Sequence, residues 1–462
     1  MDIVAHAAQT FGESPAIVTS ERRWSFADLD TDTARIAAAF ATCGIRRGDI
    51  VALVAPNSAP LVLALMALMR MGAVAAPVNH RFPASHIDGV LARLKPTMTF
   101  NAAKLETFVA DALAGTSPIF TAASEMNRQV SIIHTSASSG KPKAAVHSLA
   151  NHYFSATGSA ENLPFRPGDS WLLSLPLCHV GGYSMLCKCL LGGGSLAVPS
   201  PEIPLQDSLD RFPVTHLSLV PTQLYRMLRT DGGPEQLRKL KALLLGGSAV
   251  SEPLLREAIR ETIPIYLTYG STEMSTQITT STAPVTSVTF DSGKVLPYRQ
   301  VRIAPDGEIL VKGECLFMGY LDDGGLRTAR DAEGWFHTGD MGELSDDGRL
   351  TVLGRKDSMF ISGGENIHPE EIEKALCSLE GIEEAVVVPV PDAEYGMRPV
   401  AWIKVRENSV PDDATIIESL RDTLGRLKTP VRITRNQMWR TLPGSAKIDR
   451  GWYRKAAESG NC

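Results

Sequence analysis

The chain has 462 residues, of which 44% are hydrophobic and 21% are charged, and its formal net charge is −5. This length exceeds what one hydrophobic core usually organises, so we expect two or three domains in a globular protein. The slightly acidic charge and the lack of a long basic block do not fit a protein whose main partner is nucleic acid.

The cysteines and the apolar segments indicate a reduced, cytoplasmic protein. Seven cysteines are scattered along the chain, and Cys187-x-Cys189 has no second Cys/His pair at metal-ligand spacing. The first residues lack the basic start and apolar core of a secretory signal. The most apolar stretch, 60–78, is interrupted by Arg70 and Gly72. This favours a buried helix followed by a strand over a membrane segment, so no stable membrane insertion is expected.

The first hundred residues alternate between helical and strand patterns. A capped helix follows Trp24 and ends near Gly44, residues 50–56 read as a buried strand, and residues 60–78 add a helix and another strand. Such alternation is typical of a parallel sheet with helices on both faces.

Residues 131–148 hold the most distinctive loop of the chain. The apolar pair Ile132-Ile133 opens into Thr135-Ser136-Ala137-Ser138-Ser139-Gly140, and Lys141 and Lys143 follow. Free N–H groups, short hydroxyl donors and ammonium groups suit a polyphosphate. The glycine spacing is not that of a G-x-x-x-x-G-K-[ST] loop, and a solvated surface turn would have a similar composition. We expect helix at 147–158.

Several later strands end in small or polar residues. The predicted strands are 171–177, 217–220, 242–245 and 265–268, and in open α/β sheets the ligand crevice lies beyond such carboxyl ends. From about residue 288 short strands joined by Asp-Gly turns predict a β-subdomain. After residue 356 the pattern returns to mixed α/β, with helices at 369–377 and 414–424 and strands at 385–389 and 401–405.

The predicted fold is therefore α/β. A large N-terminal domain, 1–356, would contain parallel and mixed sheets flanked by helices together with the β-subdomain, and a small α+β C-terminal domain would span 357–462.

Five segments, in order, resemble the signatures of the acyl-adenylate-forming, or AMP-binding, superfamily. They are 135–143, Tyr269-Gly270-Ser271-Thr272-Glu273, Thr338-Gly339-Asp340, Gly354-Arg355-Lys356-Asp357 and Lys447. One position departs from the pattern, because Ala137 stands where the family usually has glycine. Alanine resists positive φ, which puts the phosphate geometry of this loop in question.

The resemblance implies two half-reactions that use ATP, Mg²⁺ and CoA. A carboxylate first attacks the α-phosphate of ATP, and a thiol then attacks the acyl-adenylate. The residues implied to bind phosphate are Thr135, Ser136, Ser138, Ser139, Gly140 and Lys143. Glu273 is implied to hold Mg²⁺, Thr272 to approach the α-phosphate, and Lys447 to act as the catalytic lysine in a mobile C-terminal domain.

The other implied roles concern the nucleotide, the acid and the domain movement. Tyr269, with Gly270 and Ser271, would pack on adenine, Asp340 would bind the ribose hydroxyls, and Arg355 would reach the ribose or phosphate. Gly246, Gly247 and Ser248 would bring backbone close to the base and the acyl group. His179 would gate the acyl channel, Asp357 would be the hinge, and Gly363 and Gly364 would face the thiol channel. Taken singly, Glu273, Asp340, Lys447 and His179 could each be an ordinary structural or surface residue.

Further strings resemble o-succinylbenzoate–CoA ligases of menaquinone biosynthesis. They are 143–147, 171–177, 219–224, 245–247 and 398–400. This substrate carries a second carboxylate that needs a cation, and Arg226 is the candidate, with Thr222 and Gly247 beside it. The string 361–369 also resembles benzoate- and 4-chlorobenzoate-type CoA ligases, which is the alternative. A nucleotide- or acyl-binding protein without turnover is the hypothesis from another class, and a homodimer is left open.

Overall fold

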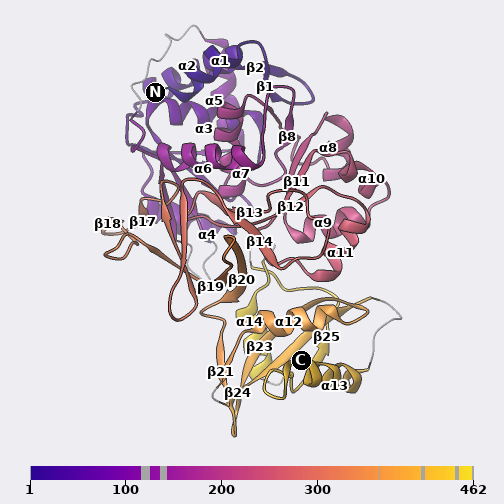
Figure 1. The fold of residues 1–462 in the computed structure, drawn as a ribbon. Helices are drawn as coiled ribbons and strands as arrows, with labels where there is room; N and C mark the ends of the chain where they lie inside the picture. The colour runs from indigo at the N-terminus through magenta and orange to yellow at the C-terminus, as the bar shows by residue number, and fades with distance from the viewer. Residues whose placement is uncertain are drawn as a thin grey trace.

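The computed structural model describes residues 2–115, 125–135, 143–363, 365–406, 412–442 and 447–459. Three sheets organise this part of the chain, and Figure 1 shows the C-terminal part, orange to yellow, as a separate layer below the rest. The α/β fold class predicted from the sequence is confirmed.

The first sheet is the largest, with thirteen strands in the described residues. Strands β8 to β12 and β1 pair in parallel, while β13 to β16, β19 and β20 add antiparallel strands of the β-subdomain. In spatial order the strands are β15 (Arg299–Ile303), β16 (Glu308–Gly313), β19 (Phe336–Leu344), β20 (Arg349–Arg355), β14 (Asp291–Val295), β13 (Thr276–Thr280), β12 (Ile265–Ser271), β11 (Ala242–Leu245), β10 (His216–Leu219), β8 (Ser170–Leu172), β9 (Ser195–Ala197), β1 (Pro15–Val18) and β2 (Arg23–Ser25).

The second sheet carries the predicted phosphate loop between two of its strands. Its order is β18 (Gly325–Arg327), β17 (Gly319–Asp322), β7 (Ala144–Ser148), β6 (Gln129–His134), β4 (Val74–Val78), β3 (Ile50–Val54) and β5 (Met98–Asn101). β6 and β7 pair in antiparallel fashion as the two strands of a hairpin, and residues 136–142 between them lie outside the described residues. The expectation of helix from His147 is therefore wrong for its first two residues, because β7 pairs with both β6 and β17 before the helix begins at Leu149.

Helices lie between and around these two sheets. The helix α6 packs on α7 and contacts both β7 of the second sheet and β13 of the first. The apolar stretch at 60–78 forms α3 and β4, and α3 starts at the Ser58 cap and ends at Gly72 with φ +81°. The helices of this part are α1 (Ile3–Phe11), α2 (Phe26–Thr42), α3 (Ala59–Met71), α4 (Ala84–Leu94), α5 (Ala102–Ala114), α6 (Leu149–Asn162), α7 (Val180–Gly192), α8 (Leu205–Arg211), α9 (Pro221–Leu228), α10 (Gly233–Arg238) and α11 (Glu252–Arg260).

Two hydrophobic clusters account for this layering. One cluster fills the space between the sheets, with α3 fully buried inside it, and the other packs α8 to α11 against the far face of the first sheet. Within the described ranges no helix is long and apolar enough to cross a membrane.

The third sheet belongs to the C-terminal part of the chain. It contains β22 (Glu365–Ile367), β21 (Phe360–Ser362), β24 (Gly396–Val405) and β23 (Ile382–Asp392), with β25 (Ile433–Arg435) paired to β24. The helices α12 (Pro369–Ser378) and α13 (Asp413–Leu424) pack on one face, and α14 (Arg450–Glu458) packs on the other. A single turn after β20 connects this sheet to the rest of the chain.

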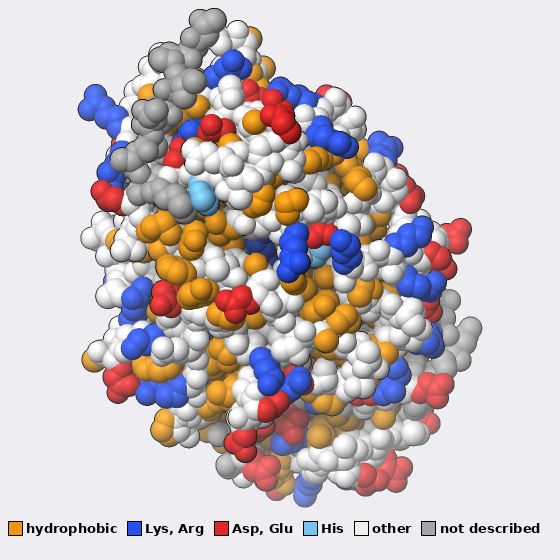
Figure 2. Space-filling model, turned by 45° about the horizontal axis from the view of Figure 1, so that its top comes forward, with side chains coloured by type: hydrophobic (Ala, Val, Ile, Leu, Met, Phe, Trp, Pro, Cys, Tyr) orange, Lys and Arg blue, Asp and Glu red, His pale blue; other side chains and the backbone are white. Residues whose placement is uncertain are grey.

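On the face shown in Figure 2 acidic and basic side chains are interspersed, and apolar side chains form scattered spots among them.

Candidate active site

The base of the phosphate loop is closed by a backbone hydrogen bond. The N–H of Thr135 donates to the carbonyl of Lys143 at 2.9 Å. The ammonium of Lys143 lies 5.1 Å from the centre of the Tyr320 ring, on β17. Ser136, Ser138, Ser139 and Gly140 lie outside the described residues. The two ends of the loop are thus held together by the backbone.

Glu273 is held from the side of the second sheet. The hydroxyl of Tyr320 donates to Oε1 of Glu273 at 2.6 Å, and the N–H of Phe317 donates to the Glu273 carbonyl at 2.7 Å. Burial and the neighbouring Glu273 charge raise the pKa of Tyr320, so its hydroxyl stays protonated and remains a donor. Sequence reasoning missed Tyr320, because nothing local marks a residue of an edge hairpin as the partner of Glu273.

The surroundings of Glu273 fit a magnesium ion bound together with a nucleotide. In the described ranges no group of three or more His, Cys, Asp or Glu side chains could hold a metal by itself. A half-buried carboxylate with one oxygen bonded to Tyr320 keeps its other oxygen for a cation. Mg²⁺ commonly takes one carboxylate together with phosphate oxygens and water, and this is the ligand set such a site offers.

Both oxygens of Asp340 are engaged by its neighbours. Tyr269 donates to Oδ2 at 2.6 Å, and Nη1 of Arg355 lies 3.0 Å from Oδ1. The Nε of Arg355 also donates to Asp357 at 3.1 Å. Burial alone would lower the pKa of Arg355, but the bond to Asp357 and the charge of Asp340 raise it overall. The guanidinium therefore stays charged and fixes the Asp340 carboxylate, as a ribose-binding group requires.

Lys447 reaches this group of residues from the C-terminal part of the chain. Burial lowers the pKa of Lys447, while the charges of Asp340 and Glu273 oppose that shift and the charge of Arg355 adds to it. Burial and the positive charge of Lys447 likewise lower the pKa of His179. Lys447 is therefore electrostatically coupled to four predicted site residues, each from a different segment of the sequence.

Two glycines close the end of β11. A Cβ on Gly246 would lie 2.6 Å from Cγ2 of Thr268, and Gly247 adopts φ +86°. Gly247 and Ser248 are exposed. The strand end therefore presents backbone rather than bulky side chains, as expected for a wall that a nucleotide or acyl group approaches.

The predicted acid-binding residues on α9 and the predicted thiol-channel residues are less engaged. Thr222 and Arg226 are exposed on α9. Gly363 adopts φ +57° and donates its N–H to Tyr395, within the C-terminal part. Gly364 lies outside the described residues, and no described contact joins Gly363 to the group around Lys447.

A buried pair of cations, Lys188 on α7 and Arg299 on β15, was not predicted. Lys188 donates to Oε1 of Gln277 at 2.8 Å, and Arg299 donates to the carbonyl of the same residue. Both side chains are buried. Burial and the charge of Arg299 lower the pKa of Lys188 to about 7. Among the described residues, no carboxylate raises the pKa of Lys188 or of Arg299. The signal in the sequence is a single lysine within the otherwise uncharged helix VGGYSMLCKCLLG.

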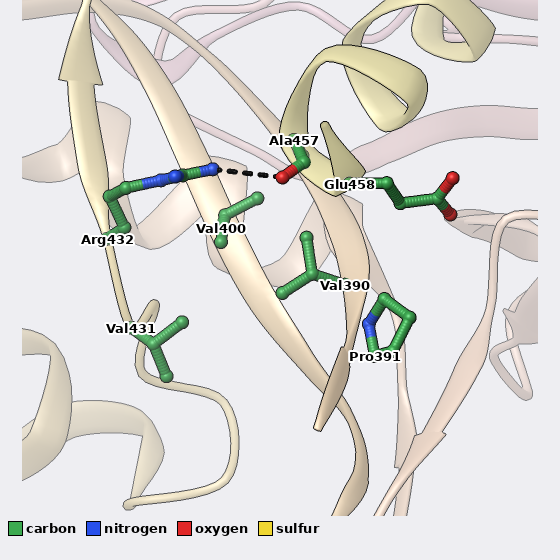
Figure 3. A pocket seen from close by; sticks show the side chains of 7 residues that line it. All are labelled: Val390, Pro391, Val400, Val431, Arg432, Ala457 and Glu458. Carbon is green, nitrogen blue, oxygen red and sulfur yellow. Dashed lines mark hydrogen bonds between the residues drawn. The ribbon is translucent and has the colours of Figure 1, made fainter. Parts of the chain in front are cut away.

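A separate hollow lies in the C-terminal part, between the edge of the third sheet and α14. In Figure 3 Arg432 points across it toward the carbonyl of Ala457, to which it donates, and Val390 and Val400 form its floor. None of the residues lining it is a predicted site residue.

Comparisons with known proteins match most of the chain to two family models. Residues 4–321 match the family model "AMP-binding enzyme", and residues 371–441 match "AMP-binding enzyme C-terminal domain". A 2-succinylbenzoate–CoA ligase of Salmonella typhimurium is 36% identical over 445 residues, which are 96% of this chain and 93% of that protein.

Solved structures give the same result. The o-succinylbenzoate CoA synthetase of Bacillus subtilis in complex with its acyl-adenylate intermediate superimposes with a TM-score of 0.85 at 27% identity, covering 98% of this chain and 97% of that one. The same enzyme in complex with ATP and magnesium ion gives a TM-score of 0.84 at 28% identity, covering 97% and 98%.

Proposed function

This chain belongs to the family of AMP-binding enzymes, and from that premise we propose that it is a 2-succinylbenzoate–CoA ligase. It would form an acyl-adenylate from ATP and the acid, and then transfer the acyl group to CoA. The observation that carries the proposal is the coupling of Lys447 to Glu273, Asp340 and Arg355. This coupling joins the two parts of the chain around the position where an acid would meet the nucleotide.

The chemistry of the first step explains why these residues are needed together. An anionic carboxylate attacks an anionic phosphate, so the step needs charge neutralisation and alignment more than a general base. Lys447 would offset the charge on the reacting phosphate, and Asp340, fixed by Tyr269 and Arg355, would orient the ribose. Glu273 would hold Mg²⁺, which when bound neutralises phosphate charge.

The buried cations favour an acid with two carboxylates over a monoacid. Arg299 is bonded to the carbonyls of Ser155, Gln277 and Pro297, so its charge has no counter-ion among the described residues. Lys188 shares this positive environment. Buried charges are stable only when paired. A substrate carboxylate that reached Lys188 would bind a cation there and would itself be the counter-ion that the two buried cations lack.

The helix that carries Lys188 supports this assignment. Gly181 and Ser184 lie seven and four residues before Lys188, so the three share one face of α7. That face begins beside His179, the residue coupled to Lys447. The face therefore runs from the residue coupled to Lys447 to the buried cation. Arg226, exposed on α9, remains the competing candidate for the distal carboxylate.

A comparison of two variants on two acids tests the substrate. Lys188→Met keeps the length of the side chain and removes its charge, and Arg226→Ala removes the competing cation. We expect Lys188→Met to lower kcat/KM for 2-succinylbenzoate by about tenfold to a hundredfold, the loss of a charge-assisted contact, and to leave the weaker turnover of benzoate unchanged.

The other outcomes decide between the alternatives. A loss confined to Arg226→Ala would place the distal carboxylate on α9. Turnover of benzoates in preference to the diacid would favour a benzoate-type ligase. ATP binding without pyrophosphate release on any acid would indicate a binding protein. A cytoplasmic location and a homodimer remain predictions from the sequence, which cell fractionation and light scattering would check.

A further inference from the structure

A buried histidine bridges the phosphate-loop hairpin and the segment that carries Glu273. Nε2 of His147, on β7, lies 2.7 Å from the carbonyl oxygen of Thr272. The two residues are 125 positions apart, and His147 has no solvent-exposed surface. Since a carbonyl only accepts, His147 carries its proton on Nε2 and donates it.

This bridge holds the Thr272 carbonyl, whereas the segment around β17 holds Glu273. The Glu273 carbonyl is bonded to Phe317 and its carboxylate to Tyr320, both from the segment around β17. The Thr272 carbonyl accepts from Ser275 within its own turn and from His147. His147 is thus the bond that ties the turn to the hairpin of the phosphate loop.

The imidazole is itself fixed by a second buried histidine. The ring of His152, on α6, lies 5.0 Å from that of His147, and its Nε2 lies 2.8 Å from Oγ of Ser131 on β6. The ring of His152 also packs 4.8 Å from Tyr183, on α7. One buried cluster therefore contacts the strand entering the phosphate loop, the strand leaving it, and the helix that begins after His179.

Burial keeps the cluster neutral. It lowers the pKa of His147 to about 4 and the pKa of His152 well below its ordinary value. The Nε2–H donor therefore persists throughout the neutral pH range, which a positioning bond requires.

We propose that His147 is a positioning residue for adenylation, which sets the Thr272–Glu273 turn, and with it the magnesium carboxylate, at a fixed place relative to the phosphate loop. His147 touches neither substrate nor nucleotide, and it acts through the Thr272 carbonyl. The inference rests on the proposed function for the identity of the reaction, but the geometry it concerns is that of ATP and Mg²⁺ binding.

Three substitutions at one position separate this role from simple packing. Gln places an N–H donor where Nε2 stands, Asn has the same group but is too short to reach Thr272, and Met fills the space without a donor. For each variant we would measure the Mg²⁺ concentration at half-maximal pyrophosphate release, the transfer of acyl groups from preformed acyl-adenylate to CoA, and the thermal midpoint.

We expect His147→Met and His147→Asn to raise the half-maximal Mg²⁺ concentration about tenfold, as for the loss of one buried hydrogen bond. His147→Gln should stay within about threefold of the wild type, and acyl transfer to CoA should be unchanged in all three. Equal effects of Gln and Met, or equal losses in both half-reactions, would overturn the proposal in favour of a packing role.

Equilibrium binding of ATP, titrated with Mg²⁺ and without any acid, separates this proposal from the proposed function. A shift in the Mg²⁺ dependence of ATP binding in His147→Met and His147→Asn, but not in His147→Gln, would support the role of His147. This result would hold even if the acid is not 2-succinylbenzoate. Identical binding curves for the wild type and all three variants would overturn it.

Discussion

The hydroxyl of Tyr225, on α9, donates a hydrogen bond of 2.6 Å to Oε2 of Glu383, on β23. Nη2 of Arg229 lies 3.8 Å from the other oxygen of Glu383, and the Arg229 guanidinium lies 3.5 Å from the centre of the Tyr225 ring. The contact joins the N-terminal and C-terminal parts of the chain, in the arrangement that couples Lys447 to Glu273 and Asp340. It therefore stabilises the arrangement in which we propose that adenylation takes place.

Tyr225→Phe should change the balance between the two half-reactions. Phe keeps the ring under Arg229 and removes the hydrogen bond to the charged acceptor Glu383. The observed arrangement of the two parts of the chain therefore loses stability relative to arrangements that lack this bond. We expect acyl-adenylate formation to slow about threefold to tenfold, while transfer from preformed adenylate to CoA does not slow. Single-turnover measurements of each half-reaction would check this.

Asp413→Asn is the control for this experiment. Asp413, on α13, lies 2.6 Å from Nη1 of Arg435, inside the C-terminal part. Its substitution should leave both half-reactions unchanged. If Tyr225→Phe slowed both half-reactions equally, the contact would be a general stabilising one with no bearing on domain arrangement.

Lys447→Ala should abolish adenylation and spare thioester formation. The ammonium is needed while the phosphate anion is attacked, and the second step attacks a carbonyl with a thiol. Pyrophosphate release and the reaction of preformed acyl-adenylate with CoA would be measured separately. Lys455→Ala, an exposed lysine on α14, serves as the control and should behave as the wild type. Adenylation near the wild-type rate would show that Lys447 is not the catalytic lysine.

Lys188 should make the folding stability rise with pH. Its pKa is about 7 in the folded protein against an ordinary value of 10.5, so between these values the unfolded chain binds more protons than the folded one. The free energy of unfolding therefore increases with pH across that window, and Lys188→Met removes this contribution. Denaturant unfolding of both proteins from pH 7 to 10 would check the difference.

The same shift predicts proton uptake when the diacid binds. Near pH 8 Lys188 is largely neutral in the free protein, and a carboxylate beside it would raise its pKa. Calorimetric titration with 2-succinylbenzoate in buffers of different ionisation enthalpy should show protons taken up by the wild type. Uptake that persisted in Lys188→Met would assign the proton to another group.

Ala137→Gly should not inactivate the enzyme, because it restores the residue that the family usually has. Glycine widens the range of φ open to the phosphate loop, so we expect an equal or lower KM for ATP. Steady-state kinetics with ATP varied would measure it. A large loss of activity would mean that the loop depends on alanine at this position.

The sequence by itself determined the order of the main elements and the family to which the chain belongs, and it predicted the residues of the nucleotide site. Period, caps and turn residues are local signals, so α3, β10 and β11 could be predicted to within about one residue at their ends. The predicted strand 265–268 instead continues to Ser271, because β12 pairs with β13. The ordered motifs likewise gave Glu273, Asp340, Arg355 and Lys447, because each lies in a short string that can be compared residue by residue.

The tertiary structure alone decided which distant residues meet. His147 lies in β7 rather than in a helix because that strand pairs with β6 and β17, and this register in turn sets His147 against Thr272 and Tyr320 against Glu273. Lys188 reads in the sequence as one lysine on a helix, and only packing around Gln277 and Arg299 buries it without a counter-ion. Such contacts depend on sheet register and on the packing of separate segments, and no local period or turn signal encodes either of these.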